Sequence, residues 1–246
     1  MGKVALVTGG SRGIGRAIAI ALADVGAHVV LTYNSNQVFA NEVINTITMR
    51  GGKSISIQMT LEDSVSVRRC ITLVKERFGS INILVNNAAI AQEKPFDTIT
   101  DADWDRMLAV NLRGPFICCQ EVLPEMIANG WGRIINITSI GGQWGGFNQV
   151  HYAASKAGLI SLTRSLARIY SRHGITTNAV APGLVGTEMS TRELDSDEGR
   201  EKIKNIPIGR IAIIEEIAQV VVFLATDAAS YITGQTINVN GGMYFG

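Results

Sequence analysis

Short apolar runs alternate with segments of helical periodicity along the whole of this 246-residue chain. The predicted strands are Lys3–Thr8, His28–Tyr33, Lys53–Gln58, Ile83–Asn86, Gly132–Thr138, Thr176–Ala181 and Thr236–Val239. The predicted helices are Gly13–Val25, Gln37–Arg50, Ser64–Phe78, a stretch beginning near Thr100, Gln149–Arg172 and Glu215–Thr226. This alternation predicts an α/β fold, a doubly wound parallel sheet of about seven strands with helices on both faces.

Composition narrows the class of protein further. Hydrophobic residues make up 46% and charged residues 17% of the chain, which is typical of a compact globular protein. A net charge of +1 argues against a dedicated nucleic-acid binder. No apolar run reaches membrane-spanning length and no signal sequence precedes the first strand, so we expect no membrane association and a cytoplasmic location. No composition break, linker or repeat divides the chain, and we expect one domain over residues 1–246.

The sulfur and imidazole groups give no sign of a metal centre. The chain has three cysteines, an odd number, and none of them has C-x-x-C spacing: Cys70, Cys118 and Cys119. This favours a reducing compartment over a disulfide scaffold. The three histidines are scattered along the chain. We therefore expect no metal site.

A glycine-rich turn, Thr8–Gly15, connects the first predicted strand to the first predicted helix. Its glycines permit a tight turn, close approach of a pyrophosphate and close packing of the helix on the sheet. The N-terminus of the following helix offers unpaired N–H groups and partial positive charge to phosphates. This position predicts a dinucleotide site that includes Gly9, Ser11, Arg12, Gly13, Ile14 and Gly15.

The end of the second predicted strand bears on the choice of nucleotide. An acidic residue there would accept the ribose hydroxyls of NAD, but the segment Leu31–Ser35, with Asn34 near its end, contains none. Arg12 in the glycine turn can pair with a 2′-phosphate through its forked donors. Both features favour NADP(H) over NAD(H), although Arg12 could also be a solvated loop residue.

A tyrosine and a lysine four residues apart begin the long predicted helix. Tyr152 and Lys156 therefore share one helix face, and a nearby ammonium should lower the pKa of the phenol. Ser139 lies just beyond the preceding strand, at the edge where open α/β sheets bind ligands. The pair alone could be an amphipathic surface pair, but this position favours proton-transfer chemistry.

Together these motifs resemble the short-chain dehydrogenase/reductase family over essentially the whole chain. The matching elements are Thr8–Gly15, Asn86–Ala88, Asn111, Ser139, Tyr152–Lys156 and Pro182-Gly183. Within that family, Ile232–Thr236 and Val239–Tyr244 are similar to the bacterial 3-oxoacyl-(acyl-carrier-protein) reductases. The resemblance implies a Rossmann-type fold and reduction of a ketone with NADP(H).

The resemblance also implies roles for four catalytic residues. Tyr152 would be the general acid, and Lys156 would hold the nicotinamide ribose and lower the pKa of Tyr152. Ser139 would hydrogen-bond the substrate carbonyl. Asn111 would hold a water of a proton relay, helped by a local helix break before Pro115 that frees a backbone carbonyl.

The remaining implied contacts surround the cofactor. Asn87 would approach its adenosine side, and Thr187 would bond the nicotinamide carboxamide. Thr60 stands where the family usually has Asp or Asn near the adenine, which leaves that contact in doubt. The further cofactor residues implied are Leu61, Ala88, Pro182, Gly183 and Val185.

The substrate side is less constrained. The segment Gly141–His151 lines the expected pocket, with substrate contacts from Gln143, Trp144, Phe147 and Gln149. His151 would have a structural or pocket-rim role. The irregular stretch Pro182–Asn205 favours a substrate lid over about 183–205, although a solvated surface insertion has the same composition.

Partners follow from the resemblance. A homotetramer and an acyl carrier protein are expected. Arg164, Arg168 and Arg172 form a helical stripe that could dock an acidic carrier or simply compensate the helix dipole. At one docking position of the relatives, an arginine is replaced by Gly130. The alternatives are therefore a reductase or dehydrogenase of a sugar, a sugar nucleotide or another small polar ketone, and a non-catalytic dinucleotide sensor.

Overall fold

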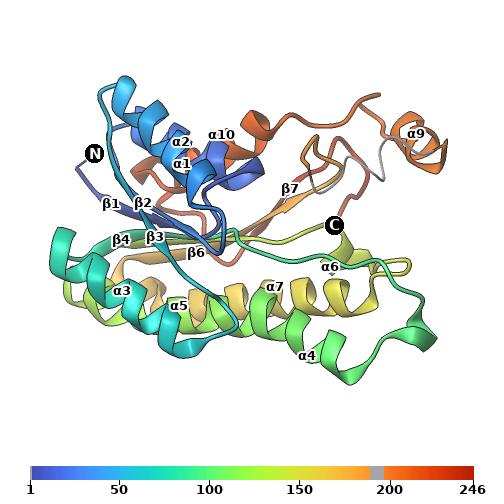
Figure 1. Ribbon diagram of the computed structural model, residues 1–246, viewed down its shortest axis with the longest axis horizontal. Helices are drawn as coiled ribbons and strands as arrows, with labels where there is room; N and C mark the ends of the chain where they lie inside the picture. The colour runs from blue at the N-terminus through green and yellow to red at the C-terminus, as the bar shows by residue number, and fades with distance from the viewer. Residues whose placement is uncertain (1, 189–196) are drawn as a thin grey trace.

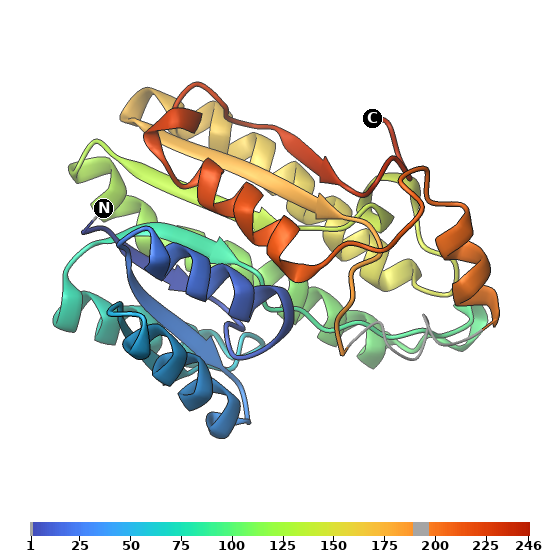
Figure 2. The ribbon, with the colours of Figure 1, turned by 90° about the horizontal axis from the view of Figure 1, so that it is seen from above.

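The computed structural model describes residues 2–188 and 197–246. Its strands are β1 (Val4–Val7), β2 (His28–Tyr33), β3 (Lys53–Gln58), β4 (Ile81–Asn86), β5 (Gly132–Ile137), β6 (Ile175–Pro182) and β7 (Thr236–Val239). They form one parallel sheet in the order β3-β2-β1-β4-β5-β6-β7, and Figure 2 shows them running in one direction. The doubly wound parallel fold predicted from the sequence is confirmed.

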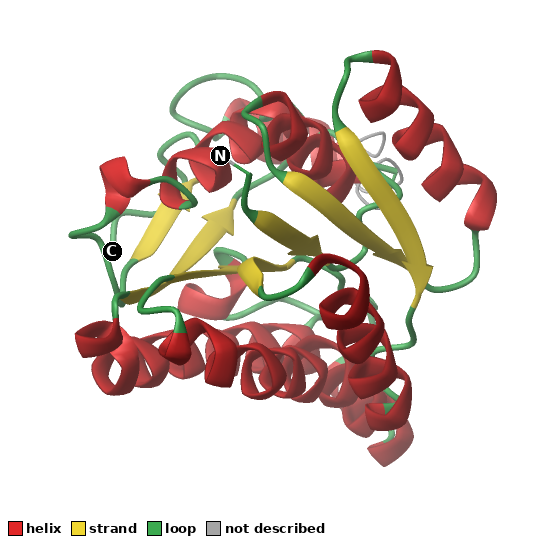
Figure 3. Cartoon of the chain, turned by 90° about the vertical axis from the view of Figure 1, so that its left-hand side faces the viewer, coloured by secondary structure: helices red, strands yellow, loops and turns green. Residues whose placement is uncertain are grey.

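The helices lie in two layers on the two faces of the sheet (Figures 1 and 3). On one face are α1 (Gly13–Asp24), α2 (Gln37–Met49) and α10 (Ile214–Leu224). On the other are α3 (Ser64–Phe78), α4 (Asp101–Leu108), α5 (Gly114–Ala128) and α7 (Val150–Tyr170). Two short helices, α6 (Gly141–Trp144) and α9 (Asp197–Lys204), lie at the end of the molecule where α7 begins.

The strands build two cores because successive side chains point to opposite faces of the sheet. In β1, Ala5 and Val7 join the apolar cluster beneath α1, α2 and α10, whereas Val4 and Leu6 join the cluster beneath α3 and α5. All four side chains are buried. Burial on both sides explains why the strands read as continuous apolar runs rather than alternating ones.

The stretch that begins near Thr100 is the most irregular of the predicted helices. Thr100 caps α4: its hydroxyl accepts from the Asp103 N–H at 3.2 Å, and the Asp103 carboxylate accepts from the Thr100 N–H at 3.0 Å. A π-helical turn, Ala109–Arg113, then separates α4 from α5. Pro115 follows at the start of α5 and has no N–H to continue the ordinary ladder. The predicted local break near Asn111 is confirmed.

Two predicted irregular segments contain helix. Residues 197–204 form α9, so the prediction of an irregular stretch over Pro182–Asn205 is wrong for that part, and residues 189–196 of the expected lid lie outside the described residues. The loop after Ser139 contains α6. With 8 residues in α9 and 4 in α6, both helices give too few apolar positions for a periodic pattern.

Candidate active site

The glycine-rich turn lies at the carboxyl end of β1 and has a backbone that larger residues would disrupt. Gly9 and Gly13 have φ angles of +64° and +53°. A Cβ on Gly15 would lie 2.2 Å from the Gly9 carbonyl oxygen and 2.5 Å from the Asn87 amide nitrogen. The turn therefore needs glycine for conformation at two positions and for close packing at a third.

The start of α1 has the features of a phosphate site. Arg12 is the N-cap residue, makes no side-chain cap, and no acidic residue lies in the first turn. The first N–H groups of the helix have no acceptor within the helix, and the N-cap side chain does not supply one. They lie at the end of the helix that carries partial positive charge. Ser11, Gly13 and Ile14 lie in this turn, so the residues present fit a dinucleotide pyrophosphate.

Asn87 and Ala88, just after β4, support this turn. The Asn87 amide donates to the carbonyls of Thr8 and Gly9 at 3.0 and 3.2 Å. The backbone N–H groups of Asn87 and Ala88 both donate to the Thr8 hydroxyl at 3.0 Å. Asn87 thus holds the glycine turn in shape, and its approach to adenosine stays a prediction.

The ends of β2 and β3 meet at the predicted adenosine side. The Thr60 hydroxyl donates to the Asn34 side-chain oxygen at 3.0 Å, so these two predicted residues lie together. Leu61 is buried in the core beneath α3 and α5, where it packs against Gly114. Its side chain is therefore part of the wall behind the site rather than an exposed contact.

The segment after β6 lies beside the glycine turn. The Gly183 N–H donates to the Val239 carbonyl at 3.1 Å, which fixes the segment beside Pro182 to β7. Val185 is buried and pairs with Ala212. A Cβ on Gly13 would lie 3.8 Å from the Thr187 side chain, so Thr187 faces the start of α1.

Ser139, Tyr152 and Lys156 come together at the carboxyl edge of the sheet. The Tyr152 hydroxyl hydrogen-bonds Ser139, two residues beyond β5. The Lys156 amine donates to the Ile137 carbonyl at 2.9 Å and lies 5.6 Å from the centroid of the Tyr152 ring. The three side chains predicted to carry the chemistry are therefore neighbours.

The pKa of Tyr152 differs from the sequence-based expectation. Burial raises it above the ordinary value of 10, and the hydrogen bond from Ser139 opposes this only in part. The prediction that Lys156 lowers it is wrong, because the amine donates to the Ile137 carbonyl rather than to the phenol oxygen, and only burial and Ser139 shift the pKa of Tyr152. A phenol with a raised pKa stays protonated at neutral pH, which suits a proton donor.

Lys156 is itself strongly perturbed. Its side chain is 2% exposed, and burial lowers its pKa from 10.5 to about 8. Ile137 is at the end of β5, so the strand supplies an acceptor for the buried amine. A group that titrates near neutral pH in a buried cluster is typical of functional sites.

Asn111 lies within the π-helical turn and is completely buried. Its amide makes two hydrogen bonds to the backbone of Ile90, each 2.9 Å, and donates to the Ser155 hydroxyl at 3.2 Å. The side chain thus joins the segment after β4 to α7. The predicted relay water would have to bind the backbone of this turn, and that role stays a prediction.

The four predicted substrate residues are not equally available. The Gln143 amide donates to Asn238 on β7 at 2.6 Å, and Trp144 packs edge-on against Tyr244 with ring centroids 6.0 Å apart. The Gln149 amide donates to Glu93 at 3.1 Å. Phe147 is 94% exposed and has no comparable packing. Phe147 is therefore the side chain of this set with the most surface to offer a ligand.

The arginine stripe of α7 lies away from Tyr152 of the same chain. Arg164 and Arg168 are exposed, roughly 18 and 24 Å along the helix axis from Tyr152. Arg172 lies beyond the end of α7, in the turn Ser171–His173. This position favours compensation of the helix dipole over docking beside the same chain's entrance.

Several functional contacts escaped the sequence analysis. The Thr8 hydroxyl accepts a hydrogen bond from the backbone of the segment after β4. The Asn238 side-chain oxygen accepts one from the Gln143 amide. Arg12 makes an exposed ion pair of 3.4 Å with Glu188, which lies in the segment after β6. Only Thr8 had a local signal, because it ends the first strand directly before the glycine turn. Among the described residues there is no cluster that could hold a metal ion, and no helix is long and apolar enough to span a membrane.

A doubly wound sheet with a phosphate-binding turn and a Ser-Tyr-Lys cluster at its carboxyl edge defines a nucleotide-dependent oxidoreductase. Residues 9–244 match the family described as enoyl-(acyl carrier protein) reductase. The chain belongs to the short-chain dehydrogenase/reductase family.

Curated relatives match nearly end to end. A 3-oxoacyl-[acyl-carrier-protein] reductase FabG of Staphylococcus epidermidis is 44% identical over 244 residues, covering 99% of this chain and 100% of the relative. The protein of the same name from Aquifex aeolicus is 43% identical, covering 99% and 98%. The family resemblance predicted from the motifs is confirmed.

Solved structures agree on the fold. A protein described as an NAD(P)-dependent gluconate 5-dehydrogenase from Beutenbergia cavernae, with bound NADP, superimposes with a TM-score of 0.94. It is 36% identical, and the match covers 98% of this chain and 96% of that one. A blue fluorescent protein from a metagenomic library, in complex with NADPH, gives a TM-score of 0.93 at 36% identity, covering 99% and 98%.

Proposed function

We propose that this protein reduces 3-oxoacyl-[acyl-carrier-protein] to 3-hydroxyacyl-[acyl-carrier-protein] with NADPH, as in fatty acid biosynthesis. The observation that carries the proposal is the 42–44% identity to reductases of that name along nearly the whole chain. The Ser139, Tyr152 and Lys156 cluster supports it, because reduction of a ketone needs a carbonyl anchor and a proton donor.

Each residue of the cluster has a distinct chemical task. The nicotinamide, when bound, supplies the hydride that reaches the carbonyl carbon. The Ser139 hydroxyl hydrogen-bonds the carbonyl oxygen, and Tyr152 donates its hydroxyl proton to that oxygen as the C=O π electrons move onto it. The Lys156 ammonium lies 5.6 Å from the centre of the Tyr152 ring and, without hydrogen-bonding the phenol oxygen, would stabilise by its charge the phenolate left behind. The Asn111 turn would hold the relay that reprotonates Tyr152.

Cofactor preference gives the first testable prediction. Arg12 should pair with the 2′-phosphate of NADPH, and a charge-assisted hydrogen bond contributes about 1.5–3 kcal/mol. We expect Arg12→Ser to weaken NADPH binding roughly 10-fold or more and to leave NADH binding within about twofold. Fluorescence titration of both nucleotides measures this, with Arg16→Ser, an exposed arginine one turn further along α1, as the matched control. Equal losses for both nucleotides would remove Arg12 from 2′-phosphate recognition.

A polar ketone is the second candidate substrate. It is favoured by the likeness to a protein described as a gluconate 5-dehydrogenase. A steady-state panel separates the candidates by following NADPH consumption with acetoacetyl thioesters, an enoyl thioester and keto-sugar acids. Turnover of keto-sugar acids without turnover of 3-oxoacyl thioesters would reject the proposed function.

We also propose that the protein assembles as a homotetramer in the cytoplasm. The outer face of α4, α5 and α7 supports self-association, because its groove combines apolar and charged side chains that a second copy could contact. The apolar ones are Leu108, Leu112, Phe116 and Leu162, and the charged ones are Glu62, Asp105, Arg106 and Arg113. Phe116 is 46% exposed although it is a large apolar residue. The three cysteines are free and buried, which is compatible with a reducing compartment.

The assembly proposal predicts a mass of four chains by light scattering coupled to size exclusion. Phe116→Glu should shift the mass to that of a smaller species, because it replaces the large exposed apolar side chain of the groove with a charge. Val38→Glu, an exposed apolar position on α2, is the control and should not change the mass. A wild-type protein that elutes as a monomer at micromolar concentration would contradict the proposal.

A further inference from the structure

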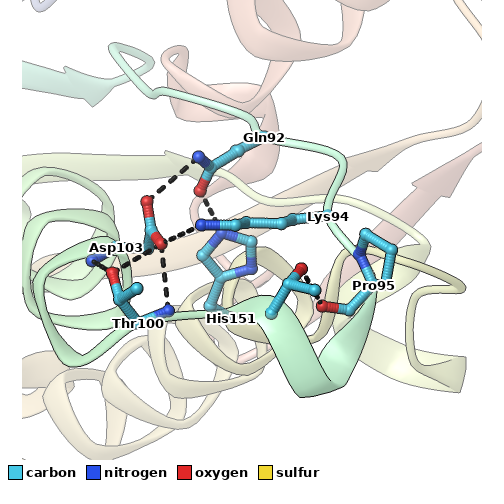
Figure 4. A network of polar contacts seen from close by, with 7 residues as sticks. Gln92, Lys94, Pro95, Thr100, Asp103 and His151 are labelled. Carbon is cyan, nitrogen blue, oxygen red and sulfur yellow. Dashed lines mark hydrogen bonds and ion pairs between the residues drawn. The ribbon is translucent and has the colours of Figure 1, made fainter.

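A polar network, half-buried around a buried histidine, joins the first turn of α7 to the segment after β4 and to α4 (Figure 4). At its centre is His151, which is 0% exposed and precedes Tyr152. Its Nε2 lies 2.8 Å from the Gln92 side-chain oxygen. Because the Gln92 amide nitrogen donates to Asp103 at 3.1 Å, the oxygen faces His151, and the imidazole is the Nε2–H donor.

Burial, rather than the charged residues of the network, favours a neutral imidazole. The Asp103 carboxylate accepts from Lys94 at 2.6 Å and from the Thr100 hydroxyl at 2.6 Å, contacts that hold the pKa of Asp103 well below its usual range. Burial lowers the pKa of His151; Asp103 opposes this shift and Lys94 adds to it. The buried Nδ1 has no hydrogen-bond partner among the described residues, so a proton there would lack an acceptor.

The segment that His151 contacts, residues 89–95, runs from Asn87 and Ala88 after β4 to the residues that precede α7. The backbone of Ile90 is fixed by the Asn111 amide. The Lys94 N–H donates to the Asn148 carbonyl at 2.7 Å, and Gln149 donates to Glu93. The His151–Gln92 contact lies between these attachments, and it is the one that ends on the residue next to the catalytic tyrosine.

We propose that His151 is a positioning residue which, as a neutral donor to Gln92, fixes the segment 89–95 against the start of α7 and so sets the position of the Tyr152 hydroxyl. The inference rests on the proposed function. A displacement of about 1 Å of a reacting group can cost up to roughly 100-fold in rate, so a hydrogen bond at this place can affect turnover without touching the substrate.

Variants at both ends of the contact test the proposal. His151→Leu should lower kcat roughly 10-fold while KM and Kd for NADPH change less than about twofold. His151→Gln, which keeps a side-chain donor, should recover most of the lost rate. Gln92→Leu should lower kcat similarly, and the double variant should be no worse than either single one. His173→Gln, at an exposed histidine, is the control.

Three outcomes would overturn the proposal: unchanged kcat in His151→Leu, no recovery in His151→Gln, or additive losses in the double variant. A readout independent of turnover separates this inference from the proposed function. Because the folded pKa of His151 lies below the unfolded value of 6.5, wild-type stability should fall as pH drops below 6.5, and less so in His151→Gln. If the wild type turns over no ketone, the proposed function fails. The contact between His151 and Gln92 can still be tested in that case, by the difference in stability with pH and by whether the two substitutions have non-additive effects on the free energy of unfolding.

Discussion

Replacing Tyr152 by phenylalanine is expected to lower kcat for ketone reduction by roughly 10²–10⁴-fold, the range that general acids contribute. The substitution removes one hydroxyl, its hydrogen bond to Ser139 and the transferable proton, and leaves the ring in place. NADPH binding should stay within about twofold of wild type, because the phosphate-binding turn is untouched. Steady-state kinetics with an acetoacetyl thioester and a nucleotide titration measure the two effects.

A matched variant on the same helix isolates the hydroxyl. Tyr170 is at the far end of α7, and Tyr170→Phe should keep full activity. If Tyr152→Phe retains more than about a tenth of the wild-type kcat, another group donates the proton. The non-catalytic sensor hypothesis makes a different prediction, namely tight NADPH binding by the wild type with no turnover of any carbonyl.

Replacing Lys156 by methionine should abolish most activity and at the same time stabilise the fold at neutral pH. The lysine pKa is about 8 in the folded chain against 10.5 for the unfolded value, so charging the buried amine below pH 8 costs roughly 3 kcal/mol. Methionine avoids that cost but leaves the Ile137 carbonyl without this donor, so we expect a net gain of about 1–3 kcal/mol in unfolding free energy. Urea unfolding at pH 7 measures it.

The pH dependence of this stability gain distinguishes charge from packing. Between pH 8 and 10.5 the wild-type folded chain holds Lys156 neutral while the unfolded chain still carries the proton, so the penalty shrinks as pH rises through this window. The advantage of Lys156→Met should therefore be smaller at pH 10 than at pH 7. Lys53→Met, at an exposed lysine, serves as the control. A variant less stable than wild type at pH 7 would show that the amine's contacts outweigh its desolvation.

The fold could be predicted because its signals are local. Strands buried on both faces read as apolar runs, helices as amphipathic repeats, and Thr8–Gly15 as a turn that needs glycine. The proximity of Ser139, Tyr152 and Lys156 was predictable for the same reason: Tyr152 and Lys156 are four residues apart, and Ser139 follows a strand. Their roles still depend on the reaction proposed for them.

What could not be predicted depends on contacts distant in sequence. The Gln143 amide hydrogen-bonds Asn238, and Arg12 forms an ion pair with Glu188. No local sequence pattern predicts these pairings, because the partners are far apart in the chain. The direction of the Tyr152 pKa shift was missed because it depends on burial by several elements rather than on the spacing to Lys156. The sequence predicted a structural or pocket-rim role for His151 but not its partner, because Gln92, which it contacts, and Asp103, which Gln92 contacts, belong to other segments.

The most direct test of a proton-donating Tyr152 beside a charged Lys156 is the pH dependence of kcat for NADPH-driven reduction between pH 7 and 10. The phenol, whose pKa is raised above 10, stays protonated over this range, while the amine loses its charge near pH 8. The rate is predicted to be level near pH 7 and to fall with an apparent pKa of about 8. A rate that rises through this window would mean that a deprotonated group drives reduction, which contradicts the mechanism.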